Sequence, residues 1–121
     1  MREMEGEQVL MRIFLGERDR WHHRSLTDVL IELFKKEGFA GATALHGTQG
    51  FGPNSVNIHK DSILRLSEDL PVVIEVVDSD ERIQSILPKL DEMIGSGLIT
   101  LEKVRVIRYG PSRDPKARKK E

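Results

Sequence analysis

The sequence contains no cysteine among its 121 residues. This absence excludes disulfides, zinc sites with thiolate ligands, iron–sulfur clusters and thiol nucleophiles. No apolar run approaches the roughly 20 residues that a membrane-spanning helix needs. The first residues are charged, so neither a signal peptide nor a membrane anchor is predicted. We therefore expect a cytoplasmic protein without membrane insertion, folded as one domain with its own core.

Neither sign of charge dominates the chain. It has 20 acidic and 19 basic residues, which gives no general support for nucleic-acid binding. Positive charge gathers only in residues 111–121, which hold five basic and two acidic side chains. This segment has almost no apolar residue and is typical of a disordered, solvated tail. Contact with RNA or lipid headgroups is the alternative use of such a tail. Residues 1–7 are predicted to be a flexible N-terminus.

Two helices are predicted from apolar residues that recur with helical spacing. The first begins after Ser25, whose hydroxyl can cap it with Asp28 in a capping-box position, and it ends before Gly38. The second begins near residues 78–80, which offer further caps. Pro88 lies within its pattern and predicts a kink or a late start.

Four strands are predicted from short runs of apolar, often β-branched residues. They span residues 8–15, 39–45, 70–77 and 98–109. The β-α-β-β-α-β order is that of a ferredoxin-like sandwich, an α+β fold in which two helices cover one face of an antiparallel sheet. The strand at 70–77 is apolar on both faces. The uncovered face is therefore predicted to pack against other copies in a homo-oligomer.

The most informative segment is Gly41–Gly52, in which a strand leads into a glycine-rich turn. Gly47, Gly50 and Gly52 carry no Cβ, so their backbone N–H groups can approach an anion closely. The spacing matches neither the P-loop nor the dinucleotide-binding signature. A phosphate-bearing ligand is one interpretation of this segment, and glycines that serve only turns are the other.

A long loop is predicted from residue 46 to residue 68, with a helical turn at 61–66. Long loops in small domains commonly carry function.

The four histidines offer a different chemistry, because imidazole is a common metal ligand. They are His22, His23, His46 and His59. Their spacing indicates no particular site, since two adjacent histidines do not easily converge on one ion. Surface histidines are favoured, and metal coordination stays as the alternative.

Several short motifs resemble the PII signalling superfamily. They are Gly38–Thr43, Gly50–Gly52, Gly95–Ile99 and Ile107–Gly110. The run Leu66–Asp78 resembles the uncharacterised branch of that superfamily known as UPF0166, or domain of unknown function 190. The likeness extends from about Val9 to Gly110.

The resemblance implies a PII-like ferredoxin-like domain at residues 8–110 that assembles as a homotrimer. Adenine nucleotides would bind in clefts between subunits. A mobile T-loop at about residues 47–68 would engage a partner protein, such as a membrane transporter or an enzyme. The related divalent-cation tolerance family implies the alternative, a metal-binding or purely structural trimer.

The chain departs from the superfamily near the expected phosphates. It lacks the lysine that PII proteins place there, and Val106 stands where a second arginine is expected. The resemblance implies an adenine nucleotide as the effector, and the candidates are AMP, ADP, ATP and cyclic AMP.

The predicted ligand-binding residues lie on two sides of the implied cleft. Thr43 and the Gly50–Gly52 backbone would line one side, and Gly95, Gly97 and Arg108 the other, where an arginine offers a charged fork to phosphate. The full set is Thr43, Gly47, Gly50, Phe51, Gly52, Gly95, Gly97 and Arg108.

No catalytic residue, metal ligand or permanent cofactor is predicted. The strand and helix order is also that of acylphosphatases, but those enzymes need a glycine-rich phosphate loop between the first strand and the first helix. Gly16 is the only glycine in that link, and no serine lies in a nucleophile turn. The sequence thus predicts a sensor and not an enzyme.

Overall fold

The structure, a computed structural model, describes residues 4–52 and 69–111. Predictions for residues 1–3, the helical turn at 61–66, His59 and the tail beyond residue 111 lie outside these ranges. No helix within the described residues is long and apolar enough to cross a membrane.

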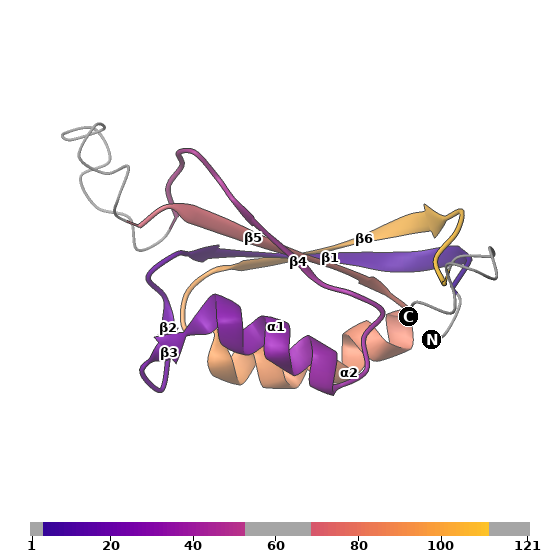
Figure 1. The fold of residues 1–121 in the computed structure, drawn as a ribbon, viewed down its shortest axis with the longest axis horizontal. Coiled ribbons are helices and arrows are strands. Elements are labelled where there is room, and N and C mark those ends of the chain that lie inside the picture. Colours follow the sequence, from indigo (N-terminus) through magenta and orange to yellow (C-terminus); the bar gives the residue numbers. More distant parts are fainter. Residues whose placement is uncertain (1–3, 53–68, 112–121) are drawn as a thin grey trace.

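A four-stranded antiparallel sheet carries two helices on one of its faces (Figure 1). The sheet order is β4-β5-β1-β6, and the predicted α+β ferredoxin-like fold is confirmed. The strands are β1 (Gly6–Gly16), β4 (Thr43–His46), β5 (Pro71–Asp78) and β6 (Leu98–Val106), and the helices are α1 (Leu26–Lys36) and α2 (Asp80–Met93). A short hairpin of β2 (Arg20–Trp21) and β3 (Arg24–Ser25) precedes α1.

The helices begin where their capping residues predict. Ser25 caps α1 by accepting the Asp28 N–H, and Ser79 caps α2 by accepting the Arg82 N–H. Gly38 has a φ of 78°, the left-handed conformation that ends α1. The prediction of a late start at Pro88 is wrong, because α2 begins at Asp80 and runs through the proline.

Two strand boundaries differ from the prediction by three residues or more. β4 begins at Thr43 and not at Phe39, because the Phe39 ring packs edge-on against Phe34 and the Ala40 N–H donates to Asp78. β6 ends at Val106 and not at Tyr109. The Tyr109 hydroxyl instead donates to the carbonyl of Ala40, in the segment between α1 and β4.

The hairpin between β1 and α1 was not predicted. Its turn residues, His22 and His23, have φ values of 48° and 71°, which is the type I′ pattern usually made by asparagine and glycine. Arg24 in this hairpin donates two hydrogen bonds to the Glu32 carboxylate on α1. These hydrogen bonds lower the pKa of Glu32 below its ordinary value.

The core lies between the sheet and the helices. Alternate residues of β1 and β5 point into it, since successive strand residues face opposite sides. The completely buried members are Met11, Ile13, Leu30, Ile74, Ile83 and Leu90.

The opposite sheet face carries an apolar row with no helix over it. The register aligns Leu45, Val73, Phe14 and Leu98 across all four strands. Phe14, Leu45 and Leu98 are 36%, 49% and 54% exposed. Beside this row, Arg12 Nε lies 2.9 Å from Glu75 Oε2. This face is the one from which the sequence predicts self-association.

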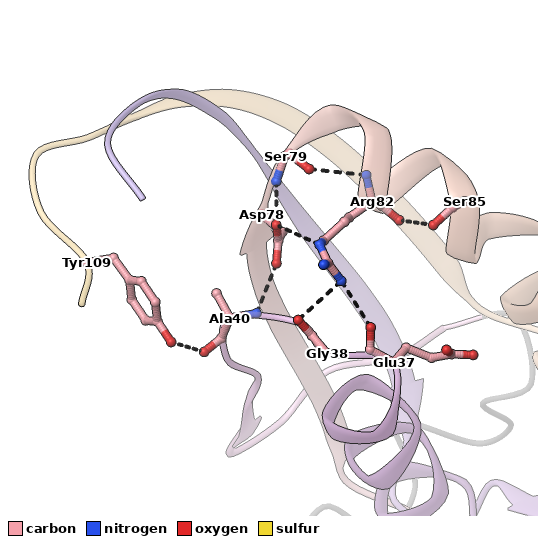
Figure 2. A network of polar contacts seen from close by, with 8 residues as sticks. All are labelled: Glu37, Gly38, Ala40, Asp78, Ser79, Arg82, Ser85 and Tyr109. Atoms are coloured by element: carbon pink, nitrogen blue, oxygen red, sulfur yellow. Dashed lines mark hydrogen bonds and ion pairs between the residues drawn. The ribbon is translucent and has the colours of Figure 1, made fainter. Parts of the chain in front are cut away.

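One buried carboxylate joins the end of β5 to both helices (Figure 2). Asp78 is completely buried and accepts the Ala40 N–H at 2.9 Å and the Ser79 N–H at 2.7 Å. Arg82 Nε lies 4.0 Å from the same carboxylate, and Arg82 Nη1 donates to the Glu37 carbonyl at 3.0 Å. Asp78, itself shielded from water, therefore satisfies backbone donors at this junction.

We expect Asp78→Ala to lower the free energy of unfolding by about 3 kcal/mol, because it leaves the N–H groups of Ala40 and Ser79 without their acceptor and removes the carboxylate beside the Arg82 guanidinium. Urea denaturation followed by circular dichroism measures the change. Asp91→Ala, at an exposed position of α2, is the control and should change stability by less than about 0.5 kcal/mol. Equal losses in the two variants would contradict this role of Asp78.

Candidate functional site

A cavity of about 210 Å³ lies at the end of the sheet where β1 stops and β6 starts. Three separate parts of the chain form most of its wall: the end of β1 from Phe14 to Gly16, the segment Gly50–Gly52, and residues 96–98. Asp19, Asp69 and Pro71 are the other described residues of the wall. The pairing of β1 with both β5 and β6 brings these segments together.

Four of the predicted ligand-binding residues line this one cavity. They are Gly50, Phe51, Gly52 and Gly97. Phe51 is 77% exposed, so its ring is available to a ligand. Gly52 and Gly97, more than forty residues apart in the sequence, therefore meet at this cavity.

The other four predicted residues lie outside the cavity wall. Gly95 precedes the lining residue Ser96, and the Gly47 N–H donates to the Pro71 carbonyl at 2.7 Å. Thr43 lies opposite Glu75 in the sheet. Arg108 follows the end of β6, which pairs with the start of β1, so it lies at the far end of the sheet, roughly 25 Å from the cavity.

Packing explains part of the glycine pattern. A Cβ on Gly97 would lie 2.8 Å from the Phe14 carbonyl oxygen, which is closer than real Cβ contacts. A Cβ on Gly47 would lie 2.7 Å from Pro71 Cγ. A Cβ on Gly52 or Gly95 would meet no atom of the described residues within 4 Å. Gly97 and Gly47 therefore allow the backbone to approach its neighbours, whatever else they contact.

Two carboxylates in the cavity wall were not predicted as site residues. Asp19 Oδ2 accepts the Gly16 N–H at 3.1 Å, and Asp69 Oδ1 accepts the Arg18 N–H at 3.0 Å. No lysine or arginine is among the described residues that line the cavity. No local motif marks these two carboxylates. The antiparallel register places Gly16 opposite Pro71, so Asp19 and Asp69 lie at the same end of the sheet.

A second hollow lies beside the N-terminus of α1, and Arg18, Arg20 and His46 contribute to its wall. His46 Nε2 lies 3.6 Å from Glu17 Oε1, so one basic side chain already has an acidic neighbour. Ser25, also in this wall, accepts the Asp28 N–H as a helix cap. Acidic and basic side chains are mixed in this wall, so it favours no particular class of ligand.

The three histidines that the structure describes do not lie together. His22 and His23 form the hairpin turn, while His46 ends β4. Within residues 4–52 and 69–111, no three side chains of histidine, aspartate or glutamate converge on a point where a metal ion could bind.

Comparison with known sequences gives a consistent group of relatives. Residues 8–106 match the profile of the family DUF190, described as "Uncharacterized ACR, COG1993". A UPF0166 protein of Methanocaldococcus jannaschii is 37% identical over 100 residues, which cover 82% of this chain and 91% of that protein. A UPF0166 protein of Aquifex aeolicus is 37% identical over 103 residues, covering 84% and 94%.

Solved structures with the same fold are more distant in sequence. One from Thermus thermophilus, called a putative PII-like signaling protein, has a TM-score of 0.56 and 20% identity over 88% of this chain and 94% of its own. CPII from Thiomonas intermedia K12, in a structure with ADP, AMP and acetate, has a TM-score of 0.52 and 14% identity over 91% and 93%. At these identities the matches show a shared fold.

We expect Gly97→Ala to lower the free energy of unfolding by about 2 kcal/mol, because the added methyl group meets the Phe14 carbonyl and Ile94. Gly95→Ala is the matched control, since a Cβ there meets no described atom within 4 Å. Thermal unfolding of the two variants measures the difference. If both melt at the same temperature, close packing is not the reason for glycine at position 97.

Proposed function

This chain belongs to the UPF0166 family, DUF190, and on that basis we propose that it is a PII-like regulatory protein that binds an adenine nucleotide. The observation that carries this proposal is the cavity that joins the Gly50–Gly52 segment to Gly97. It places a glycine-rich backbone and an exposed aromatic ring on one concave surface, as ligand sites generally do. The protein acts as a sensor, without catalysis of its own, and it works in the cytoplasm.

The domain of residues 8–110 assembles as a homotrimer in this proposal. The apolar row of Leu45, Val73, Phe14 and Leu98 supports self-association, because a contiguous exposed apolar surface of this kind usually marks an interface. Arg12 pairs with Glu75 within the same face, so its charge is already balanced where copies would meet.

Assembly would also complete the ligand site. Arg108 is too far from the cavity of its own chain to contact a ligand there. A neighbouring copy can bring its Arg108 to the mouth of the cavity, where the guanidinium would bind phosphate oxygens. Thr43, Gly47 and Gly95 would flank the same cleft.

Ligand binding would be passed to a partner protein through the segment at about residues 47–68, which contains Gly50–Gly52 near its start. The partner is a membrane transporter or an enzyme. A ligand that contacts the start of this segment in only one of its conformations shifts the population able to bind the partner.

The assembly is tested by Leu45→Glu, which places a charge in the apolar row without touching the cavity. Light scattering should give three times the chain mass of 13.8 kDa for the natural sequence and a smaller mass for the variant. Gln84→Glu on the exposed side of α2 is the control and should stay trimeric. A natural protein of single-chain mass would rule out the trimer.

The ligand is tested by calorimetry with AMP, ADP, ATP and cyclic AMP. At least one should bind more tightly than about 1 mM, a binding free energy of about −4 kcal/mol. Arg108→Ala should weaken it about tenfold or more, because a charge-assisted hydrogen bond to phosphate is lost. Arg105→Ala is the control. If no nucleotide reaches that affinity, the nucleotide proposal is wrong.

A further inference from the structure

The cavity is too small for a whole nucleotide. Its volume of about 210 Å³ is below the roughly 300–1,000 Å³ of sites that enclose a complete ligand. Much of its wall is apolar, with the rings of Phe14 and Phe51 and the side chains of Leu98 and Pro71. Flat heteroaromatic rings pack well against such a surface. The cavity therefore suits the base end of a nucleotide.

Asp19 and Asp69 make the same cavity unfavourable for phosphate. Both are carboxylates, and no basic side chain among the described lining residues balances them. A phosphate group in this space would be repelled by both carboxylates. Phosphates would instead lie outside, toward the side from which a neighbouring Arg108 would approach.

The two carboxylates are well placed to accept hydrogen bonds from a ligand. Each uses one oxygen to accept a backbone N–H of the same turn, at Gly16 and at Arg18, so the two groups are held close together. Within residues 4–52 and 69–111, Asp19 Oδ1 and Asp69 Oδ2 have no hydrogen bond or ion pair. Two acceptors beside Gly16 could each take a hydrogen bond from one of the two adjacent hydroxyl groups of a ribose.

We infer that Asp19 and Asp69 accept hydrogen bonds from the ribose hydroxyls of the ligand and keep its phosphates out of the cavity. This inference rests on the proposed function, since it takes an adenine nucleotide as the ligand. It assigns the cavity of a single chain to the nucleoside end and reverses the expectation that the glycine-rich turn holds phosphate.

Adenosine and ATP, titrated in magnesium-free buffer into the natural protein, Asp19→Asn and Asp69→Asn, test the inference. Asparagine keeps an oxygen for the backbone N–H but removes one negative charge. Each variant should improve the affinity for ATP relative to adenosine about fivefold. Glu81→Gln is the control, because Glu81 is exposed in the first turn of α2, on the helix side of the sheet and outside the cavity wall, and should leave the ratio unchanged.

The outcomes separate the two proposals. If adenosine binds and the ratio is the same in all four proteins, Asp19 and Asp69 do not discriminate against phosphate and the inference is overturned, while the proposed function stands. If neither adenosine nor any adenine nucleotide binds to the natural protein, the proposed function fails and takes the inference with it.

A second measurement needs no variant and so does not depend on how the variants fold. Adenosine and 2′,3′-dideoxyadenosine are compared on the natural protein by calorimetry. A site that hydrogen-bonds the hydroxyls should bind the dideoxy compound at least about tenfold more weakly. Equal affinity for the two nucleosides would overturn the role given to the carboxylates.

Discussion

Strand β1 is hydrogen-bonded on both sides over almost its whole length, to β5 and to β6. Its register decides which of its residues face the helices, because a shift of one residue would exchange the two faces. The present register buries Met11 and Ile13 under the helices and aligns Phe14 with the apolar row on the opposite face. It also brings Gly16 opposite Pro71 and Phe14 opposite Leu98. The core, the exposed face and the cavity all follow from this one pairing.

Local sequence patterns predicted the helices and most strands because the information for them is local. The spacing of Leu26, Leu30 and Phe34 fixes the buried side of α1, and Ser25 and Ser79 fix where the helices start. The hairpin was missed because its turn contains His22 and His23, residues that rarely adopt positive φ in succession. The start of β4 was missed because contacts of Phe39 and Ala40 with distant residues decide it.

The candidate site shows the same division between local and long-range information. Gly50, Gly52 and Gly97 could be predicted as site residues because they belong to short local motifs. Asp19 and Asp69 did not, since single carboxylates fifty residues apart carry no pattern until the register brings them together. Glycine at position 97 has a packing reason besides any role in ligand binding, because a Cβ there would lie too close to the Phe14 carbonyl oxygen.

The contact between Tyr109 and Ala40 has a mechanical consequence (Figure 2). Tyr109 follows β6 and Ala40 precedes β4, and these strands form the two opposite edges of the sheet. The hydrogen bond therefore links the segments next to the two edge strands at one end of the sheet. The cavity lies at the other end, where no hydrogen bond among the described residues links the segments next to β4 and β6. The hydrogen bond thus limits how far the two edges can separate at the end of the sheet opposite the cavity.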